Sequence, residues 1–203
     1  MGSKVAFNKK GYEVVKKVIS KEMSEFIFNY FILKRQVADT FYKSNYMEEN
    51  GLMGIWDDTQ VSNTYSLYAD FVFETLLWWL KPTMEKETGL KLVETYSYSR
   101  IYNKGAVLKK HSDRKSCEIS ATLNLGGDKW PIYLEKNKQE IEVNLSPGDM
   151  LIYRACELKH WRYKFKGNCC AQVFFHYNRK DNNLANKYDG RPHLGLPSYF
   201  KKE

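Results

Sequence analysis

Three side chains in the second half of the sequence have the types and spacing that bind one metal ion. His111 and Asp113 stand two positions apart, so on an extended strand both side chains leave the same face. His160 begins a later strand-like segment, which a folded sheet can bring back beside this pair. Two imidazoles and one carboxylate on one face leave the opposite side of the ion open, as non-haem Fe(II) centres require for a co-substrate and O2.

Chance produces this short pattern quite often. The chain has four histidines, and a His-x-Asp match is expected in roughly one such chain in five on ordinary composition. The pattern gains weight because strand-like segments flank it and lead to His160. The other two histidines, His176 and His193, are predicted to be hydrogen-bonded core or surface residues and not metal ligands.

The first half of the chain is predicted to be mainly helical. Residues 12–19 carry valines and an isoleucine in weak alternation and are predicted to form a first strand. Ser20 is then a helix N-cap, and apolar residues recur at helical spacing as far as Phe41. A second helix is predicted over about 65–87, with Pro82 kinking or restarting it.

From residue 91 the chain is predicted to be all β, because segments rich in Val, Ile, Tyr and Thr alternate with turn residues at roughly ten-residue intervals. The predicted strands are Val93–Tyr102, Val107–His111, Cys117–Leu125, Pro131–Glu135, Gln139–Asn144, Asp149–Arg154, His160–Phe165 and Cys169–Tyr177. We therefore expect an α+β fold: a double-stranded β-helix (jelly roll) of about eight core strands, with two long N-terminal helices packed on one sheet.

The length of 203 residues suits one compact domain. We expect residues 1–90 to supply helical support and a loop, residues 91–178 to form the jelly-roll catalytic core, and residues 179–203 to be an irregular tail.

A long polar loop is predicted over Asn45–Asn63. It carries Met53, Trp56, Asp57 and Asp58, and it exceeds the usual length of a connection in a compact domain. Such loops are often functional, so we expect this one to act as a lid over the mouth of the barrel and to touch the substrate.

Composition restricts the possible partners and location. The net charge of +8 comes from scattered lysine pairs and not from one dense tract, which favours a role in solubility and makes nucleic acid an unexpected but not excluded partner. The longest apolar stretch, 71–80, is far shorter than the roughly 20 residues that cross a bilayer. No apolar segment follows the first four residues, so we expect a cytoplasmic protein with its four cysteines reduced.

Several short motifs between about Leu92 and Asn178 carry a family resemblance. They are Tyr96–Tyr102, Gly105, His111–Arg114, Ser120–Leu125, Trp130–Tyr133, Ser146–Asp149 and the block His160–Tyr177. Together they resemble the 2-oxoglutarate- and Fe(II)-dependent dioxygenases, in the prolyl 4-hydroxylase-like branch. The retained Asp113 is similar to that of the hydroxylating members, because halogenating members have a small residue in its place.

The resemblance implies a cofactor set and a reaction. Fe(II) would be bound by His111, Asp113 and His160, and 2-oxoglutarate would chelate it and be decarboxylated to succinate as O2 oxidises the substrate. Tyr102 and Thr122 match positions at which the family contacts the co-substrate. Ascorbate as a supporting reductant, and a peptide or protein substrate with proline as the leading residue, also follow from the resemblance.

One departure from the family concerns the far carboxylate of 2-oxoglutarate. Prolyl hydroxylases bind it with a Lys or Arg nine or ten positions after the distal histidine, where this chain has Cys169 and Cys170. Arg162 is our first candidate for the role, because it lies two positions after His160 and shares its strand face. Arg100, which shares a face with Tyr102, is the second.

Two other functions remain open from the sequence. One is a nucleic-acid demethylase of the same superfamily, which the positive charge favours but for which no basic tract or base-flipping insertion is found. The other is a cupin-like sandwich that binds a ligand without catalysis, in which the His111, Asp113 and His160 side chains are merely structural.

Overall fold

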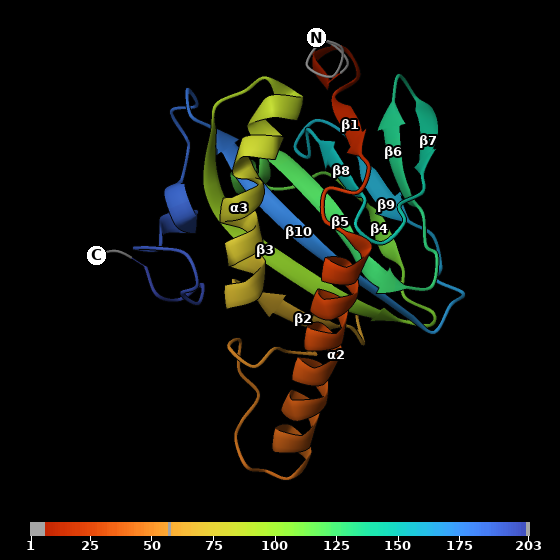
Figure 1. The fold of residues 1–203 in the computed structure, drawn as a ribbon, viewed down its shortest axis with the longest axis vertical. Coiled ribbons are helices and arrows are strands. Elements are labelled where there is room, and N and C mark those ends of the chain that lie inside the picture. The colour runs from red at the N-terminus through yellow and green to blue at the C-terminus, as the bar shows by residue number, and fades with distance from the viewer. Residues whose placement is uncertain (1–6, 57, 202–203) are drawn as a thin grey trace.

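Two antiparallel β-sheets form the body of the structure, a computed structural model that describes residues 7–56 and 58–201 (Figure 1). The strands are β1 Tyr12–Val15, β2 Tyr65–Tyr68, β3 Leu92–Asn103, β4 Leu108–His111, β5 Ile119–Gly127, β6 Ile132–Lys136, β7 Gln139–Val143, β8 Met150–Tyr153, β9 His160–Arg162 and β10 Cys169–Arg179. The helices are α2 Lys21–Lys43 and α3 Phe71–Thr88, with the short 3-10 helices η1 Lys115–Cys117 and η2 Lys187–Gly190.

The strand order is that of a jelly roll. The larger sheet has the order β1-β8-β5-β10-β3-β2, and the smaller sheet has the order β4-β9-β6-β7. Strands β3 to β10 thus divide into four and four, and each predicted core strand is confirmed to within a few residues at its ends. Short segments rich in β-branched and aromatic residues, separated by turn residues, were a sufficient signal. Most side chains of β3, β5 and β10 are buried on both faces, because the helices cover the outer face of the larger sheet.

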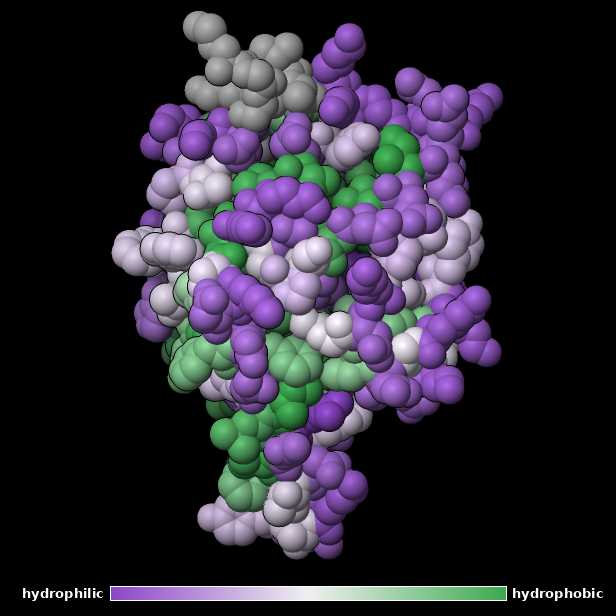
Figure 2. Space-filling view, turned by 45° about the vertical axis from the view of Figure 1, so that its right-hand side comes forward, coloured by the Kyte–Doolittle hydropathy of each residue, from purple (hydrophilic) through white to green (hydrophobic). Residues whose placement is uncertain are grey.

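Both long helices lie on the outer face of the larger sheet, α2 across β5 and α3 over β3 and β10 (Figure 1). The predicted N-cap is confirmed, because the Ser20 side chain accepts a hydrogen bond from the backbone N–H of Met23. Helix α2 buries Ile27 and Phe31 against the sheet. On the face shown in Figure 2, hydrophilic side chains cover most of the surface, and hydrophobic ones show between them in the upper half and along the lower part, where α2 extends beyond the sheet.

The second helix begins later than the sequence predicted. Residues 65–68 form the edge strand β2, which pairs with β3. Ala69 then has a positive φ of 56°, and the Asp70 side chain caps the new helix by accepting from the N–H of Val72. The prediction over 65–87 was wrong at its start because the aromatic and aliphatic residues there suit a strand as well as a helix. Helix α3 continues through Pro82, which neither ends nor restarts it.

Both chain ends differ in detail from expectation. Strand β1 stops at Val15, so the predicted strand over 12–19 was too long, and Lys17 turns the chain with a positive φ of 51°. The tail, which was expected to be irregular, contains η2. An ion pair attaches it to α3, because Arg191 Nη1 lies 3.1 Å from Oε2 of the buried Glu74. None of the helices among the described residues is long and apolar enough to cross a membrane.

Candidate active site

The three predicted metal ligands meet at the ends of two strands of the smaller sheet. His111 is the last residue of β4 and His160 the first residue of β9, and the two are paired across the sheet. Their ring centroids lie 4.2 Å apart. Asp113, just beyond β4, is held by a 2.9 Å hydrogen bond from its backbone N–H to the carbonyl of Ala155. The fold therefore brings all three side chains to one point.

The donor atoms of this triad face one another. Asp113 Oδ1 lies 3.4 Å from Nε2 of both imidazoles. The other ring nitrogen, Nδ1, is hydrogen-bonded to a backbone carbonyl in each histidine. In His111 the partner is the carbonyl of Lys109 at 2.7 Å, and in His160 it is that of Leu158 at 3.1 Å. Because Nδ1 carries the proton in such a bond, Nε2 turns its lone pair toward the carboxylate. Three facing electron-pair donors can hold one cation between them, and this set suits a divalent transition metal.

The charge of the carboxylate is stabilised by its neighbours. Burial alone would raise the pKa of the Asp113 carboxyl, but the facing His111 and His160 hold that pKa well below its usual range. Burial would also lower the pKa of His111, and the contact with Asp113 reverses this and raises it. Asp113 is therefore ionised at neutral pH, as a metal ligand must be.

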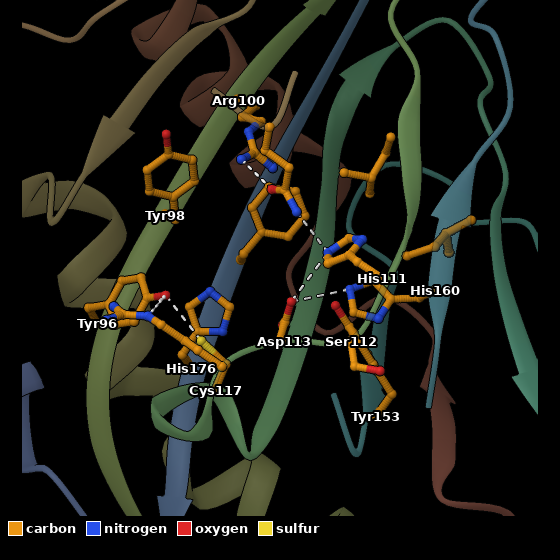
Figure 3. A pocket seen from close by; sticks show the side chains of 15 residues that line it. Tyr96, Tyr98, Arg100, His111, Ser112, Asp113, Cys117, Tyr153, His160 and His176 are labelled. Atoms are coloured by element: carbon orange, nitrogen blue, oxygen red, sulfur yellow. Dashed lines mark hydrogen bonds and ion pairs between the residues drawn. The ribbon is translucent and has the colours of Figure 1, made fainter. Parts of the chain in front are cut away.

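A cavity of about 280 Å³ opens beside the triad. One of its walls is β3, on which Tyr96, Tyr98 and Arg100 stand two positions apart and so face the same side. Figure 3 shows these three side chains across the cavity from His111 and His160. A reactant that bound the metal would therefore lie against two tyrosines and an arginine.

The strand next to β3 adds a histidine to the cavity wall. His176 of β10 is buried, and one of its ring nitrogens, Nδ1, lies 2.8 Å from the Ser120 hydroxyl, as predicted for a hydrogen-bonded core histidine. Burial lowers its pKa to about 4, so it is neutral at physiological pH. The structure adds that its ring also lines the cavity, close to Asp113 and Cys117. His193 is exposed on the tail, outside the cavity lining.

Three buried donors near the cavity have no hydrogen-bond partner among the described residues. They are Nε and Nη2 of Arg162 and the hydroxyl of Tyr102. Both side chains contact the ring of Trp130, and Arg162 also donates through Nη1 to the Trp130 carbonyl. Arg162 is only 1% exposed. A buried guanidinium without a counter-charge costs several kcal/mol, so an anionic ligand is the expected partner.

The other two predicted co-substrate residues have partners already. Thr122 is buried on β5 and lies 3.2 Å from the side-chain oxygen of Gln172. Arg100 lines the cavity directly, where its Nε donates to Asp58 and its Nη2 to Gln60. Arg162, Tyr102 and Thr122 are not among the residues that line the 280 Å³ cavity.

Comparison with known proteins places the fold. No sequence model of a known family matches this chain, and neither does any curated protein. Among solved structures, a prolyl 4-hydroxylase of Pseudomonas putida matches with a TM-score of 0.65 at 12% identity, over 88% of this chain and 97% of its own. HygX of Streptomyces hygroscopicus, solved with nickel, 2-oxoglutarate and hygromycin B, matches with a TM-score of 0.65 at 14% identity, over 100% of this chain and 97% of its own.

A third match is the viral collagen prolyl hydroxylase of Paramecium Bursaria Chlorella virus-1, solved with 2-oxoglutarate, with a TM-score of 0.57 at 11% identity over 84% of this chain and 97% of that one. The chain has the fold of the 2-oxoglutarate- and Fe(II)-dependent oxygenases. The resemblance found in the short motifs is thereby confirmed at the level of the fold.

The residues present fit both groups that the oxygenase fold implies. The His111, Asp113 and His160 donor atoms all lie within 4.8 Å of one another, a set that suits Fe(II). The unpartnered donors of Arg162 and Tyr102 suit the far carboxylate of 2-oxoglutarate. Arg162 thus stands as a candidate for the cation that Cys169 and Cys170 do not supply.

Sequence reasoning missed one residue that touches the triad. Gln60 accepts from Arg100 Nη2 through its side-chain oxygen at 2.7 Å, so its amide nitrogen faces the other way. That nitrogen lies 2.8 Å from Nε2 of His111, the atom that a metal would need. The loop length was the available signal, but no local pattern singled out this glutamine.

The predicted lid loop divides into two parts. Trp56 packs against Tyr42 and Tyr65, away from the metal ligands, whereas Asp58 and Gln60 reach the cavity wall. Asp57 lies outside the described residues. Closure of this loop over a substrate stays a prediction.

Replacing Gln60 by alanine should strengthen metal binding, by up to about fivefold, because the metal then has no hydrogen bond of about 1 kcal/mol to displace from His111. Titration with Ni(II) measures the affinity. Gln36→Ala, on the exposed face of α2, is the matched control and should change nothing. Weaker Ni(II) binding in Gln60→Ala would show that this side chain supports the metal instead.

Proposed function

We propose that this protein is a 2-oxoglutarate- and Fe(II)-dependent oxygenase that hydroxylates its substrate. The observation that carries the proposal is the convergence of His111, Asp113 and His160 at one point, with the unpartnered Arg162 and Tyr102 buried nearby. When bound, iron and 2-oxoglutarate supply the oxidation: one atom of O2 enters the substrate and the other enters succinate, with loss of CO2. Substrate carbon–hydrogen is thereby converted to carbon–hydroxyl.

The residues of the chain have separate tasks in this reaction. The two imidazoles and Asp113 hold the metal from one side. Arg162 pairs with the far carboxylate of 2-oxoglutarate and so orients the co-substrate toward the metal. The aromatic wall formed by Tyr96 and Tyr98 limits the water around the reacting carbon.

For the substrate we propose a residue in a peptide or protein, with proline as the first to test. Prolyl hydroxylases of Pseudomonas putida and of a Chlorella virus share the fold, which supports this choice. HygX, which has the same fold, was solved with the small molecule hygromycin B. The fold therefore accommodates substrates of both kinds, and the experiment must include both.

The test is incorporation of oxygen from 18O2. Purified protein with Fe(II), ascorbate and 2-oxoglutarate is incubated with a library of proline-containing peptides and, separately, with a pool of small metabolites, and products are read by mass spectrometry. We expect a product heavier by one 18O atom that is absent from the Asp113→Ala protein. A product that carries oxygen from water, or an equal yield from Asp113→Ala, would contradict the proposed reaction.

A further inference from the structure

Two arginines line the cavity beside the triad, on the side where a substrate would lie. Arg100 stands on β3, and Arg114 follows the metal-binding Asp113. Each guanidinium stacks on a tyrosine of β3: the central carbon of Arg100 lies 4.8 Å from the Tyr98 ring centroid, and that of Arg114 lies 4.8 Å from the Tyr96 ring centroid. Arg100 is buried, whereas the Arg114 side chain is 58% exposed and lies at the solvent-exposed side of the lining, where stacking on Tyr96 orients it.

In each of these arginines, some of the guanidinium nitrogens donate to a carboxylate. Arg100 donates from Nε to Asp58 at 2.6 Å and from Nη2 to Gln60 at 2.7 Å. Arg114 donates from Nη2 to Asp189 at 3.1 Å and from Nε to the Tyr96 hydroxyl at 3.3 Å. The remaining nitrogen, Nη1, makes no hydrogen bond in either arginine within residues 7–56 and 58–201. Two positioned donors are therefore left for a ligand in the cavity.

The charges around these arginines do not cancel. Asp58 balances Arg100, but it also accepts from the Tyr98 hydroxyl at 2.8 Å. Asp189 is shared between Arg114 at 3.1 Å and Lys201 at 3.6 Å, so one carboxylate faces two cations. Asp113 is the one acid among the described residues that line the cavity, and it is committed to the metal. The substrate side therefore keeps a surplus of positive charge.

We propose that the substrate carries a free acid group, a carboxylate or a phosphate, which Arg114 and Arg100 bind beside the metal. The inference rests on the proposed function for the identity of the reaction. An anion supplies both Nη1 donors with a strong acceptor and balances the surplus charge. The acid group is distinct from the far carboxylate of 2-oxoglutarate, because Arg162 lies outside the lining that holds these two arginines.

The experiment is a titration of protein saturated with diamagnetic Zn(II) and 2-oxoglutarate, followed through the side-chain 15N–1H NMR signals of its arginines. The probes are acetate, inorganic phosphate and acetamide, at constant ionic strength set by chloride. We expect acetate or phosphate, but not the neutral acetamide, to shift the Arg100 and Arg114 signals saturably. The anion with the lower Kd identifies the source of the acid group.

Two substitutions sharpen the result. Arg114→Gln should weaken anion binding by about tenfold or more, as expected for losing a charge-assisted hydrogen bond. Lys201→Gln, an exposed residue whose loss does not threaten the fold, should weaken it a fewfold, because Asp189 then neutralises Arg114 more fully. Arg179→Gln is the matched control, since Arg179 is also held by an acid, Glu118, but lies outside the cavity lining.

The inference would be overturned if neither acetate nor phosphate gave a saturable shift, or if the anion bound equally well to wild type and to Arg114→Gln. The same samples report 2-oxoglutarate affinity. If the metal or 2-oxoglutarate fails to bind, the proposed function fails, and the anion titration of the protein without them still decides whether Arg100 and Arg114 form an acid site.

Discussion

Replacing His160 by alanine should abolish both metal binding and 2-oxoglutarate turnover while the protein stays folded. The side chain supplies one of the three donors, and a pair of ligands does not hold Fe(II) against solvent in an open site. The ring lies at the start of β9 and contacts the Tyr153 ring at 4.9 Å, so its removal leaves a small gap and not a lost element. Equilibrium dialysis with Fe(II) or Ni(II) and succinate analysis measure the two effects.

The matched control for this result is His193→Ala. This histidine is exposed, and its Nδ1 contacts the carbonyl of the adjacent Leu194 at 2.7 Å. We expect its metal stoichiometry and turnover to equal those of wild type. Retained turnover in His160→Ala, with correct folding shown by circular dichroism, would remove His160 from the metal site.

Replacing Arg162 by methionine should raise the Kd of 2-oxoglutarate by one to two orders of magnitude, as expected for losing a charge-assisted pair of about 1.5 to 3 kcal/mol. Metal affinity should be unchanged, because the guanidinium is not a ligand. The free energy of unfolding without 2-oxoglutarate should stay equal or rise, because two donors of this buried side chain have no partner among the described residues. Isothermal titration and urea unfolding measure these quantities.

Arg100→Met is the informative comparison for Arg162. Arg100 is already paired with Asp58, so its loss should destabilise the fold and leave the Kd of 2-oxoglutarate nearly unchanged. If Arg100→Met weakens 2-oxoglutarate and Arg162→Met does not, the carboxylate is bound by Arg100. If neither does, the co-substrate is held by groups other than these two arginines.

The parts that the sequence predicted well are those governed by local patterns. The succession of segments rich in Val, Ile, Tyr and Thr, separated by turn residues, located β3 to β10. The two-residue spacing placed His111 and Asp113 on one side of a strand end. The return of His160 followed from the jelly-roll order, which pairs the end of β4 with the start of β9. The two-residue spacing from His160 also predicted that Arg162 points inward, and its side chain is buried.

The parts that the sequence could not give depend on contacts between distant segments. Gln60 reaches His111 across 51 positions, and Asp189 reaches Arg114 across 75. Glutamines and aspartates are common on protein surfaces, so nothing in the local sequence marks Gln60 or Asp189 as part of the site. The start of α3 was missed for a related reason: residues 65–68 become a strand because β3 offers an open edge, which the local sequence does not reveal.

The most direct test of the proposed function is conversion of 2-oxoglutarate to succinate by the purified protein with Fe(II), ascorbate and O2. We expect succinate above the level of iron-free and O2-free samples even without the substrate, at a low rate, and a rise when the substrate is added. The signal should vanish in His111→Ala and persist in His193→Ala. Succinate at the blank level in wild type that binds both Fe(II) and 2-oxoglutarate, with every substrate pool tried, would contradict an oxygenase and leave a ligand-binding protein of the same fold.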